Sequence, residues 1–285
     1  MPLFFITAGY FAKKTEVFLY VKKSFYRLIL PYLFTASVLI VYNYIRCFIK
    51  QDFQFSIFQY LLSWLCGYGF NYSDNLMSFG ALWFLTAIFC SNNILNIMLN
   101  NFKSTKTLIV ASISVCIFGI VISKFVCLPF NLDIGMYAVI FECFGYLLKK
   151  YDIEYSKVIL VLMATLGYLG GLYVYAYDLN TRQYTYPLIS TIGALGGSFL
   201  FLILCQQLEK WELLNCFLSR CGRNSLTILC LHILEHSIVP WSKVPLLYNR
   251  YFLLVTVKIV LIVLGVMIIM RIPVINKIYG YKYIK

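Results

Sequence analysis

Apolar runs of near-spanning length follow one another along almost the whole of this chain. A helix that crosses a bilayer needs about 20 mostly apolar residues. Candidate runs, separated by short polar segments, are residues 28–45, 82–99, 107–123, 134–148, 158–177, 187–205, 226–239 and 252–270. Residues 1–12 have the composition of the final part of one more span. The sequence therefore predicts an all-α, polytopic transmembrane helical bundle of about nine spans.

The scarcity of charge excludes a soluble body of this size. Hydrophobic residues make up 61% of the 285 and charged residues 12%, with a mean hydropathy of +0.81, whereas a soluble globular chain carries roughly 25% charged residues. No stretch has the composition of a linker, and no low-complexity segment occurs. We predict one membrane-embedded domain over residues 1–285, with the lipid bilayer as its surroundings.

The net charge of +13 does not indicate a nucleic-acid partner. Nucleic-acid binders gather Lys and Arg on one face or stripe, but here these residues form short clusters between apolar runs, as the positive-inside rule describes. The ten cysteines include no CxxC pair and no Cys/His spacing typical of a metal site. We expect neither nucleic acid nor metal.

Charge also assigns the topology. Residues 53–70 are long enough to cross but carry several polar side chains. If this segment does not cross, most of the 24 Lys and Arg residues fall on the side that holds residues 13–27. The exceptions are Arg46, Lys50, Lys124, Arg182, Lys243 and Arg250 on the other side, and Lys258 within a span. The positive side is cytoplasmic. We predict an interfacial or re-entrant helix at 53–70, and a multi-pass protein of the cell membrane with a cytoplasmic C-terminus.

The same topology places the first residue at the outer face of the membrane. Residues 1–12 have no charged n-region and are not a signal peptide. A natural start at that face needs an earlier span to deliver it, so we expect the domain to be N-terminally incomplete and to lack a leading helix.

Ionisable side chains at membrane depth are costly and by default mark functional sites. Glu142, His232 and Lys258 lie within predicted spans. An imidazole there suits proton transfer near neutral pH, and a carboxylate can accept a proton. The alternatives are structural: Glu142 and Lys258 as an ion pair, and His232 as a hydrogen-bonded core residue.

Amide and glycine residues inside the spans have a structural interpretation. Asn92, Asn93 and Asn96 interrupt one run and are expected to form hydrogen bonds between helices. Gly193 and Gly197 form a GxxxG pattern, which is typical of close helix packing.

A basic cluster of Lys22, Lys23 and Arg27 precedes Pro31 at a predicted cytoplasmic helix entrance. It serves either as a positive-inside anchor or as a phosphate-binding patch for an anionic cytosolic cosubstrate, because Lys and Arg suit phosphate contacts.

Five motifs in order resemble acyltransferase family 3, in particular its fucose 4-O-acetylase-like branch. They are MPLFFITAGYF at 1–11, similar to MPLFFxxSGYF of the family's second helix; KKSFYRLILPY at 22–32, similar to RxxxRLxxPY; LWFLTA at 82–87; LPFNLD and GYLLKK within 128–150; and GRNSL followed by a histidine within 222–232. Together they extend over nearly the whole chain. Ala8 stands where the family motif has Ser.

The resemblance implies an enzyme that moves an acyl group, usually acetyl from cytosolic acetyl-CoA, onto a sugar hydroxyl of a surface glycan or its lipid-linked precursor. It implies acetyl-CoA as cosubstrate and no metal. It also implies a catalytic histidine, preceded by an arginine, on a first helix that this sequence does not contain.

Site roles follow from what O-acyl transfer requires: a base for the hydroxyl, and a dock for the CoA phosphates. We assign Lys23 and Arg27 to binding of the acyl donor, and His232 and Glu142 to catalysis as proton carriers. The residues expected to hold the sugar acceptor at the outer ends of the spans are Asn131, Asp133, Asn180, Arg182 and Tyr184.

Two other classes stay open. A transporter or flippase for a glycan-lipid would share the intramembrane charges, although such proteins commonly show internal repeats and none is convincing here. The second is a catalytically inactive, truncated paralogue. The oligomeric state, the acyl group and the identity of the acceptor stay open as well.

Overall fold

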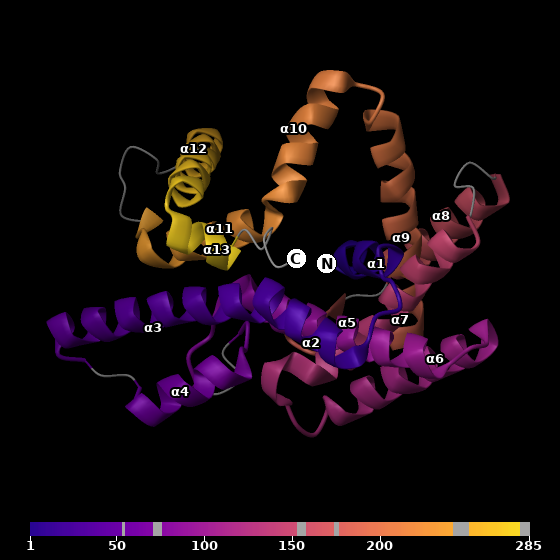
Figure 1. Ribbon diagram of the computed structural model, residues 1–285, viewed down its shortest axis with the longest axis horizontal. Helices are drawn as coiled ribbons and strands as arrows, with labels where there is room; N and C mark the ends of the chain where they lie inside the picture. Colours follow the sequence, from indigo (N-terminus) through magenta and orange to yellow (C-terminus); the bar gives the residue numbers. More distant parts are fainter. Residues whose placement is uncertain (53–54, 71–75, 153–157, 174–176, 242–250, 280–285) are drawn as a thin grey trace. The chain divides into compact units, whose positions relative to one another are not determined.

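The computed structural model describes the chain except for residues 53–54, 71–75, 153–157, 174–176, 242–250 and 280–285 (Figure 1). The described part is helical apart from one two-stranded hairpin. Its contacts divide the chain into two compact units. Unit 1 comprises Met1–Lys22 and Thr86–Cys216, and unit 2 comprises Lys23–Leu85 and Phe217–Lys285.

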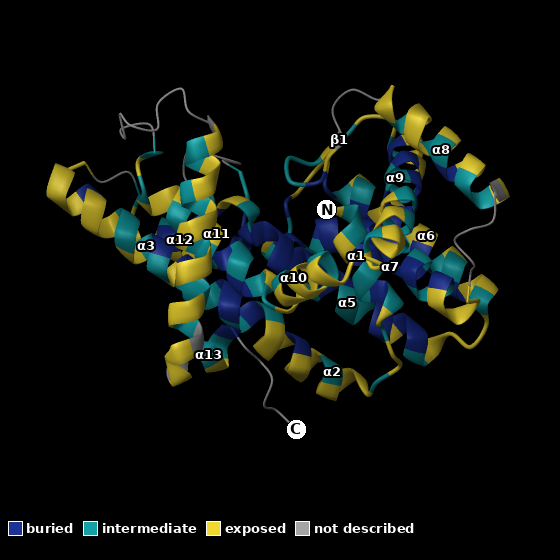
Figure 2. Cartoon of the chain, turned by 90° about the horizontal axis from the view of Figure 1, so that it is seen from above, coloured by how far each residue is buried: buried dark blue, intermediate teal, exposed yellow. Residues whose placement is uncertain are grey.

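Unit 1 is built around one buried helix, α7. The elements that lie wholly or mostly in this unit are α1 (Pro2–Tyr10), α2 (Val17–Ser24), α5 (Trp83–Asn101), α6 (Thr105–Ile122), η3 (Pro129–Asn131), α7 (Leu132–Lys150), α8 (Val158–Leu172), β1 (Tyr177–Asp178), β2 (Gln183–Tyr184) and α9 (Pro187–Leu208). Helices α1 and α6 pack on α7, and α8 packs on α9. Dark blue, buried residues gather on α5 and α7 in Figure 2.

Glycines bring the backbones of α1 and α7 into direct contact. A Cβ atom added at Gly9 would lie 1.9 Å from the carbonyl oxygen of Glu142, and one added at Gly145 would lie 1.9 Å from that of Ile6. No larger residue fits at either position without moving a backbone. The mutual approach of these glycines therefore sets how close α1 lies to the middle of α7.

Close packing around the predicted GxxxG pattern is confirmed. On α9, Gly193 faces Gly171 of α8, and a Cβ at either glycine would come within 2.7 Å of the other's Cα. A Cβ at Gly196 would lie 2.4 Å from the carbonyl of Ala164. Small residues thus let these two helices approach at backbone distance.

The asparagines of α5 hold a connecting segment rather than a neighbouring helix. The side chain of Asn96 accepts a hydrogen bond from the Thr15 backbone N–H (3.1 Å) and donates one to the Thr15 carbonyl (3.1 Å), and Asn100 donates to the same carbonyl (2.8 Å). Asn93 donates to Phe89 within its own helix. The prediction of bonds between helices is wrong for Asn96, because the non-helical backbone at Thr15 needs partners of its own.

Unit 2 contains a long helical stretch and the C-terminal helices. Its elements are η1 (Phe25–Ile29), a π-helix; α3 (Leu30–Lys50); α4 (Ile57–Cys66); η2 (Gly80–Leu82); most of α10 (Glu212–Arg223); α11 (Ser225–Ile238); α12 (Tyr251–Arg271); and α13 (Pro273–Tyr279). Helix α3 contacts α4, α11 and α13. A hydrogen bond of 2.9 Å joins the hydroxyls of Thr35 and Tyr279 and ties α13 to α3.

Helix α4 lies in the segment 53–70, for which the sequence predicts an interfacial or re-entrant helix that does not cross the membrane. Its ten residues rise about 15 Å, roughly half of the hydrocarbon core, so α4 alone is too short to cross. Tyr60 donates to Asn43 (2.6 Å) and Trp64 to the Leu33 carbonyl (3.3 Å) of α3. Residues 53–54 of the predicted segment lie outside the described residues.

Six helices in the described part are long and apolar enough to cross a membrane. They are Val17–Lys50, Gly80–Asn101, Thr105–Ile122, Pro129–Lys150, Pro187–Leu208 and Phe252–Ile269. Three predicted spans are shorter: α1 has nine residues, and the apolar helices Ile159–Leu172 and Ser225–Ile238 fall below spanning length. The predicted total of about nine is therefore not confirmed, and residues 174–176 of one of these spans lie outside the described residues.

Candidate functional site

Glu142 lies at the centre of unit 1, halfway along α7, and is fully buried. Its Oε1 accepts a hydrogen bond from the hydroxyl of Ser91 on α5, which is also fully buried. Its Oε2 has no hydrogen-bond partner among the described residues. A buried carboxyl group with one oxygen satisfied and one open is equipped to take up or release a proton.

A second polar cluster lies at the first turn of α7. The guanidinium of Arg182 donates from Nε to Asp133 Oδ2 (2.6 Å) and from Nη2 to Asp133 Oδ1 (3.2 Å) and Asn131 Oδ1 (3.1 Å). Asn131 in turn donates to Thr86 Oγ1 (2.8 Å). The side chains of Arg182 and Asp133 are 5% and 0% exposed. This is a buried, two-pronged ion pair with a hydrogen-bonded amide beside it.

Local sequence explains how the chain reaches this geometry. Asn131 adopts a left-handed conformation (φ 51°) just before α7, which Asn tolerates better than most residues. Asp133 then sits in the first helical turn, where negative charge is favoured. Across the hairpin, Asp178 accepts from the Asn180 N–H (2.9 Å) and from Thr181 Oγ1 (3.0 Å). The resulting turn directs Arg182 back to α7.

Tyr184 and Asn180 complete this cluster. The Tyr184 ring meets that of Tyr137 edge-to-face, with centroids 5.0 Å apart. Burial raises the pKa of Tyr184 above its ordinary value. Burial by itself would lower the pKa of Arg182, but the hydrogen bonds and charge of Asp133 outweigh it and raise that pKa. The Asn180 carbonyl accepts from Arg182 Nη1 (3.4 Å).

The structure thus brings together the whole set of residues predicted to hold the acceptor: Asn131, Asp133, Asn180, Arg182 and Tyr184. They come from two regions of the sequence, the start of α7 and the hairpin before α9. Their role toward a substrate stays a prediction.

In unit 2, His232 belongs to a different group of ionisable residues. Its Nδ1 lies 3.4 Å from Glu235 Oε2, and the Lys258 ammonium of α12 lies 3.7 Å from Glu235 Oε1. Lys258 also lies 5.0 Å from the ring centroid of Trp241. Within its own unit, Lys258 lies against Glu235, because α11 packs on α12, and Glu142 bonds Ser91 in the other unit. The alternative of a Glu142–Lys258 ion pair would join the two units and stays a prediction.

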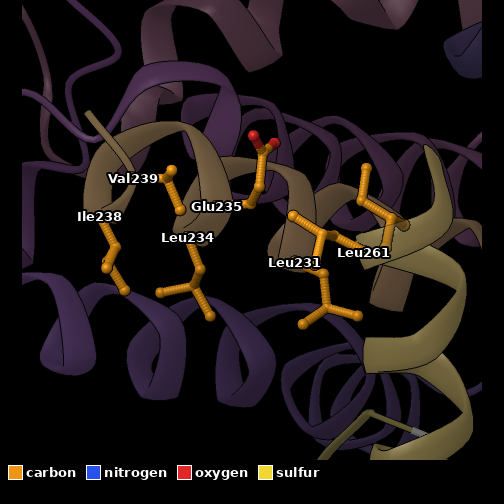
Figure 3. Close-up of a pocket in the computed structure, with 7 residues that line it drawn as sticks. Leu231, Leu234, Glu235, Ile238, Val239 and Leu261 are labelled. Atoms are coloured by element: carbon orange, nitrogen blue, oxygen red, sulfur yellow. The ribbon is translucent and has the colours of Figure 1, made fainter. Parts of the chain in front are cut away.

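The same helices border a shallow hollow (Figure 3). Its lining residues are Leu231, Leu234, Glu235 and Ile238 of α11, Val239 directly after that helix, and Leu261 and Ile262 of α12. Glu235 is the charged residue of that lining, and its side chain is 9% exposed. The sequence analysis assigned no catalytic or binding role to Glu235 or Ser91. The three-residue spacing from His232 signals Glu235, whereas no local pattern distinguishes Ser91 from other serines in spans.

Lys23 and Arg27 lie at a helical irregularity. The π-helix η1 begins two residues after Lys23 and contains Arg27, and both side chains are exposed. Short π-helical turns within α-helices occur frequently at functional sites. These cations and His232 belong to unit 2, and Glu142 belongs to unit 1.

Comparison with known proteins adds one positive finding. Residues 1–271 match the model of acyltransferase family 3, which is described as an acyltransferase domain. No curated protein and no solved structure matches the chain. In the described residues, no group of three or more His, Cys, Asp or Glu side chains is placed to hold a metal ion.

Proposed function

Because this chain belongs to acyltransferase family 3, whose model matches residues 1–271, we propose that it moves an acetyl group from cytosolic acetyl-CoA to a sugar hydroxyl. The family and the six candidate spans make it a membrane acyltransferase. The sugar, carried by a surface glycan or its lipid-linked precursor, follows from the motifs of the fucose 4-O-acetylase-like branch. The buried carboxyl of Glu142, with its open oxygen, is the observation that carries the proposed chemistry.

The reaction replaces a thioester with an oxygen ester. The sugar hydroxyl oxygen attacks the acetyl carbonyl carbon, and a base removes the hydroxyl proton as the new C–O bond forms. The C–S bond then breaks, and the CoA sulfur leaves as a thiolate that takes up a proton. The protein therefore has to supply a base, hold the two substrates in line, and stabilise negative charge on the carbonyl oxygen.

Two residues are proposed as proton carriers. Glu142 has an oxygen available for the hydroxyl proton, while Ser91 keeps the carboxyl group oriented. At His232, Nδ1 lies 3.4 Å from Glu235 Oε2. We propose the tautomer with its hydrogen on Nδ1, which has Nε2 as the nitrogen that accepts a proton. These features support roles for both residues, and kinetics decides between them.

Substrate binding is proposed at two charged or polar groups. Lys23 and Arg27 are exposed cations that suit the phosphates of CoA. The cluster around Arg182 offers carboxylate, amide and phenol groups, which suit sugar hydroxyls. It lies at the first turn of α7, whereas Lys149 and Lys150 occupy the last turn of that helix. By the charge rule, those lysines mark the cytoplasmic end of α7, so the cluster belongs at the outer end.

Glu142→Gln and His232→Ala are expected to abolish most acetyl transfer, because removing a general base lowers rates by roughly 10²- to 10⁴-fold. The measurement supplies labelled acetyl-CoA to membranes that contain the full chain and follows the label into an alkali-labile ester on the glycan fraction. Glu209→Gln and His236→Ala are matched controls at exposed positions. Wild-type rates in both test variants would overturn the catalytic assignment, and glycan-lipid translocation without any acetylated product would favour a flippase.

Lys23→Ala with Arg27→Ala is expected to raise the KM for acetyl-CoA by roughly tenfold or more, because hydrogen bonds to charged groups contribute about 1.5–3 kcal/mol each. The KM for S-acetylpantetheine, which lacks the nucleotide phosphates, should change little. Lys13→Ala with Lys14→Ala removes two exposed cations and serves as the control. An equal loss with both donors would contradict phosphate binding at this patch.

A further inference from the structure

Helix α10 is exposed along most of its length (orange in Figure 1, mostly yellow in Figure 2). None of its residues from Glu212 to Arg223 is buried. Leu213 is 91% exposed and Phe217 60% exposed, and Trp211 just before the helix is 69% exposed. The boundary between the two units falls within this helix.

The sequence of α10 is nevertheless strongly amphipathic. At 100° per residue, the apolar side chains fall on one half of the helix surface and the polar ones on the other. The apolar half holds Trp211, Leu213, Leu214, Phe217, Leu218 and Cys221, and the polar half holds Glu212, Asn215, Cys216, Ser219, Arg220 and Arg223. A clean apolar half with no buried residue indicates a partner that covers it.

We propose that α10 lies in the plane of the membrane surface, with its apolar half in the lipid and Arg220 and Arg223 on anionic lipid headgroups. The connection of α10 to the preceding helix indicates that lipid covers its apolar half. Helix α9 is a candidate span that ends at Leu208, four residues before α10 begins, so α10 starts at a membrane face. In-plane helices of this kind bury their apolar face about 5–10 Å into the boundary between headgroups and acyl chains.

The charges of α10 fit the same location. Arg220 and Arg223 occupy its last turn, and their long side chains can reach headgroups while their stems stay near the apolar boundary. The charge rule places this connection on the cytoplasmic side, where anionic lipids attract basic residues. The proposed surface is independent of the acyl-transfer chemistry.

The test measures the depth of single positions in the full chain. Cys205, Cys216 and Cys221, the cysteines that are not buried, are replaced by alanine. A fluorophore is then attached through Leu213→Cys or Phe217→Cys on the apolar half, and through Glu212→Cys or Ser219→Cys on the polar half. In vesicles of phosphatidylcholine and phosphatidylglycerol, brominated acyl chains should quench the apolar-half labels several times more than the polar-half labels, and aqueous iodide should show the reverse order.

The second part of the experiment varies the charge of the lipid. Arg220→Gln with Arg223→Gln should reduce quenching of the Phe217→Cys label in vesicles that contain phosphatidylglycerol and leave it unchanged in phosphatidylcholine alone. Equal quenching on both halves would show a helix in water and overturn the proposal. Apolar-half labels that neither brominated lipid nor iodide reaches would show a protein partner instead and overturn it as well. Leu213→Cys repeats the measurement if the Phe217 variant misfolds.

Discussion

Arg182→Ala is expected to lower the free energy of unfolding of this protein by about 3–5 kcal/mol, because it leaves a buried carboxylate without its counter-charge. Asp133 is 0% exposed, and Arg182 is the partner of both of its oxygens. The loss of the guanidinium also removes a donor from Asn131 Oδ1. Reversible unfolding of the detergent-solubilised protein, followed by helical circular dichroism, measures the change.

Two comparisons separate this effect from the general loss of an arginine. Arg46→Ala removes an exposed arginine, for which a change within about 0.5 kcal/mol is expected. The double variant Arg182→Met with Asp133→Leu removes both charges, and should regain much of the lost stability, because apolar pairs commonly replace buried ion pairs at little cost. A single Arg182→Ala variant as stable as the parent would show that the pair contributes nothing.

Gly145→Ala is expected to force α1 away from α7. The new methyl group would lie 1.9 Å from the carbonyl oxygen of Ile6, and a backbone atom cannot rotate aside as a flexible side chain can. Overpacking of this kind costs about 1–3 kcal/mol or more. Since Glu142 lies one turn before Gly145 and its own carbonyl faces Gly9, acetyl transfer should fall together with stability. Unfolding and transfer assays on the same membranes test both effects.

The matched control is Gly170→Ala in α8. Among the described residues, and apart from its chain neighbours and its own helix backbone, no atom lies within 4 Å of the position that its Cβ would take. Alanine also favours a helix interior over glycine by up to about 1 kcal/mol. This variant should be as stable as the parent or slightly more stable. If Gly145→Ala and Gly170→Ala behaved alike, close approach of α1 and α7 would not be a requirement of the fold.

Sequence reasoning identified the class of protein and most of its helices. Long apolar runs with few charges predict membrane helices from local composition alone, and the helices at 28–45, 82–99, 107–123, 134–148, 187–205 and 252–270 reappear among the candidate spans. The prediction was less successful at 1–12, 158–177 and 226–239. In the first two segments the apolar composition extends beyond α1 and α8, so composition overstates the helix length. At 226–239 the helix has the length of the apolar run, 14 residues, but that is short of the about 20 that a span needs.

Motifs also identified the family, but they did not explain why particular residues occur in them. The glycines of GYF and GYLL appeared as separate family patterns, and the structure shows that Gly9 and Gly145 pack α1 against α7 at backbone distance. Likewise, Asn131 and Asp133 were selected as polar residues at the end of a span. Their link to Arg182, 49 or more residues away, appears only when the hairpin folds back on α7.

The apolar runs alone thus determined that the chain is a helical membrane protein, because hydropathy and helix length are properties of short windows. Only the tertiary structure decided the partners of the ionisable groups: Ser91 for Glu142, Glu235 for Lys258, and Asp133 for Arg182. An ionisable side chain pairs with the oppositely charged or polar group that the packing of helices brings within about 4 Å. That packing depends on small residues far apart in the chain, which no local pattern connects.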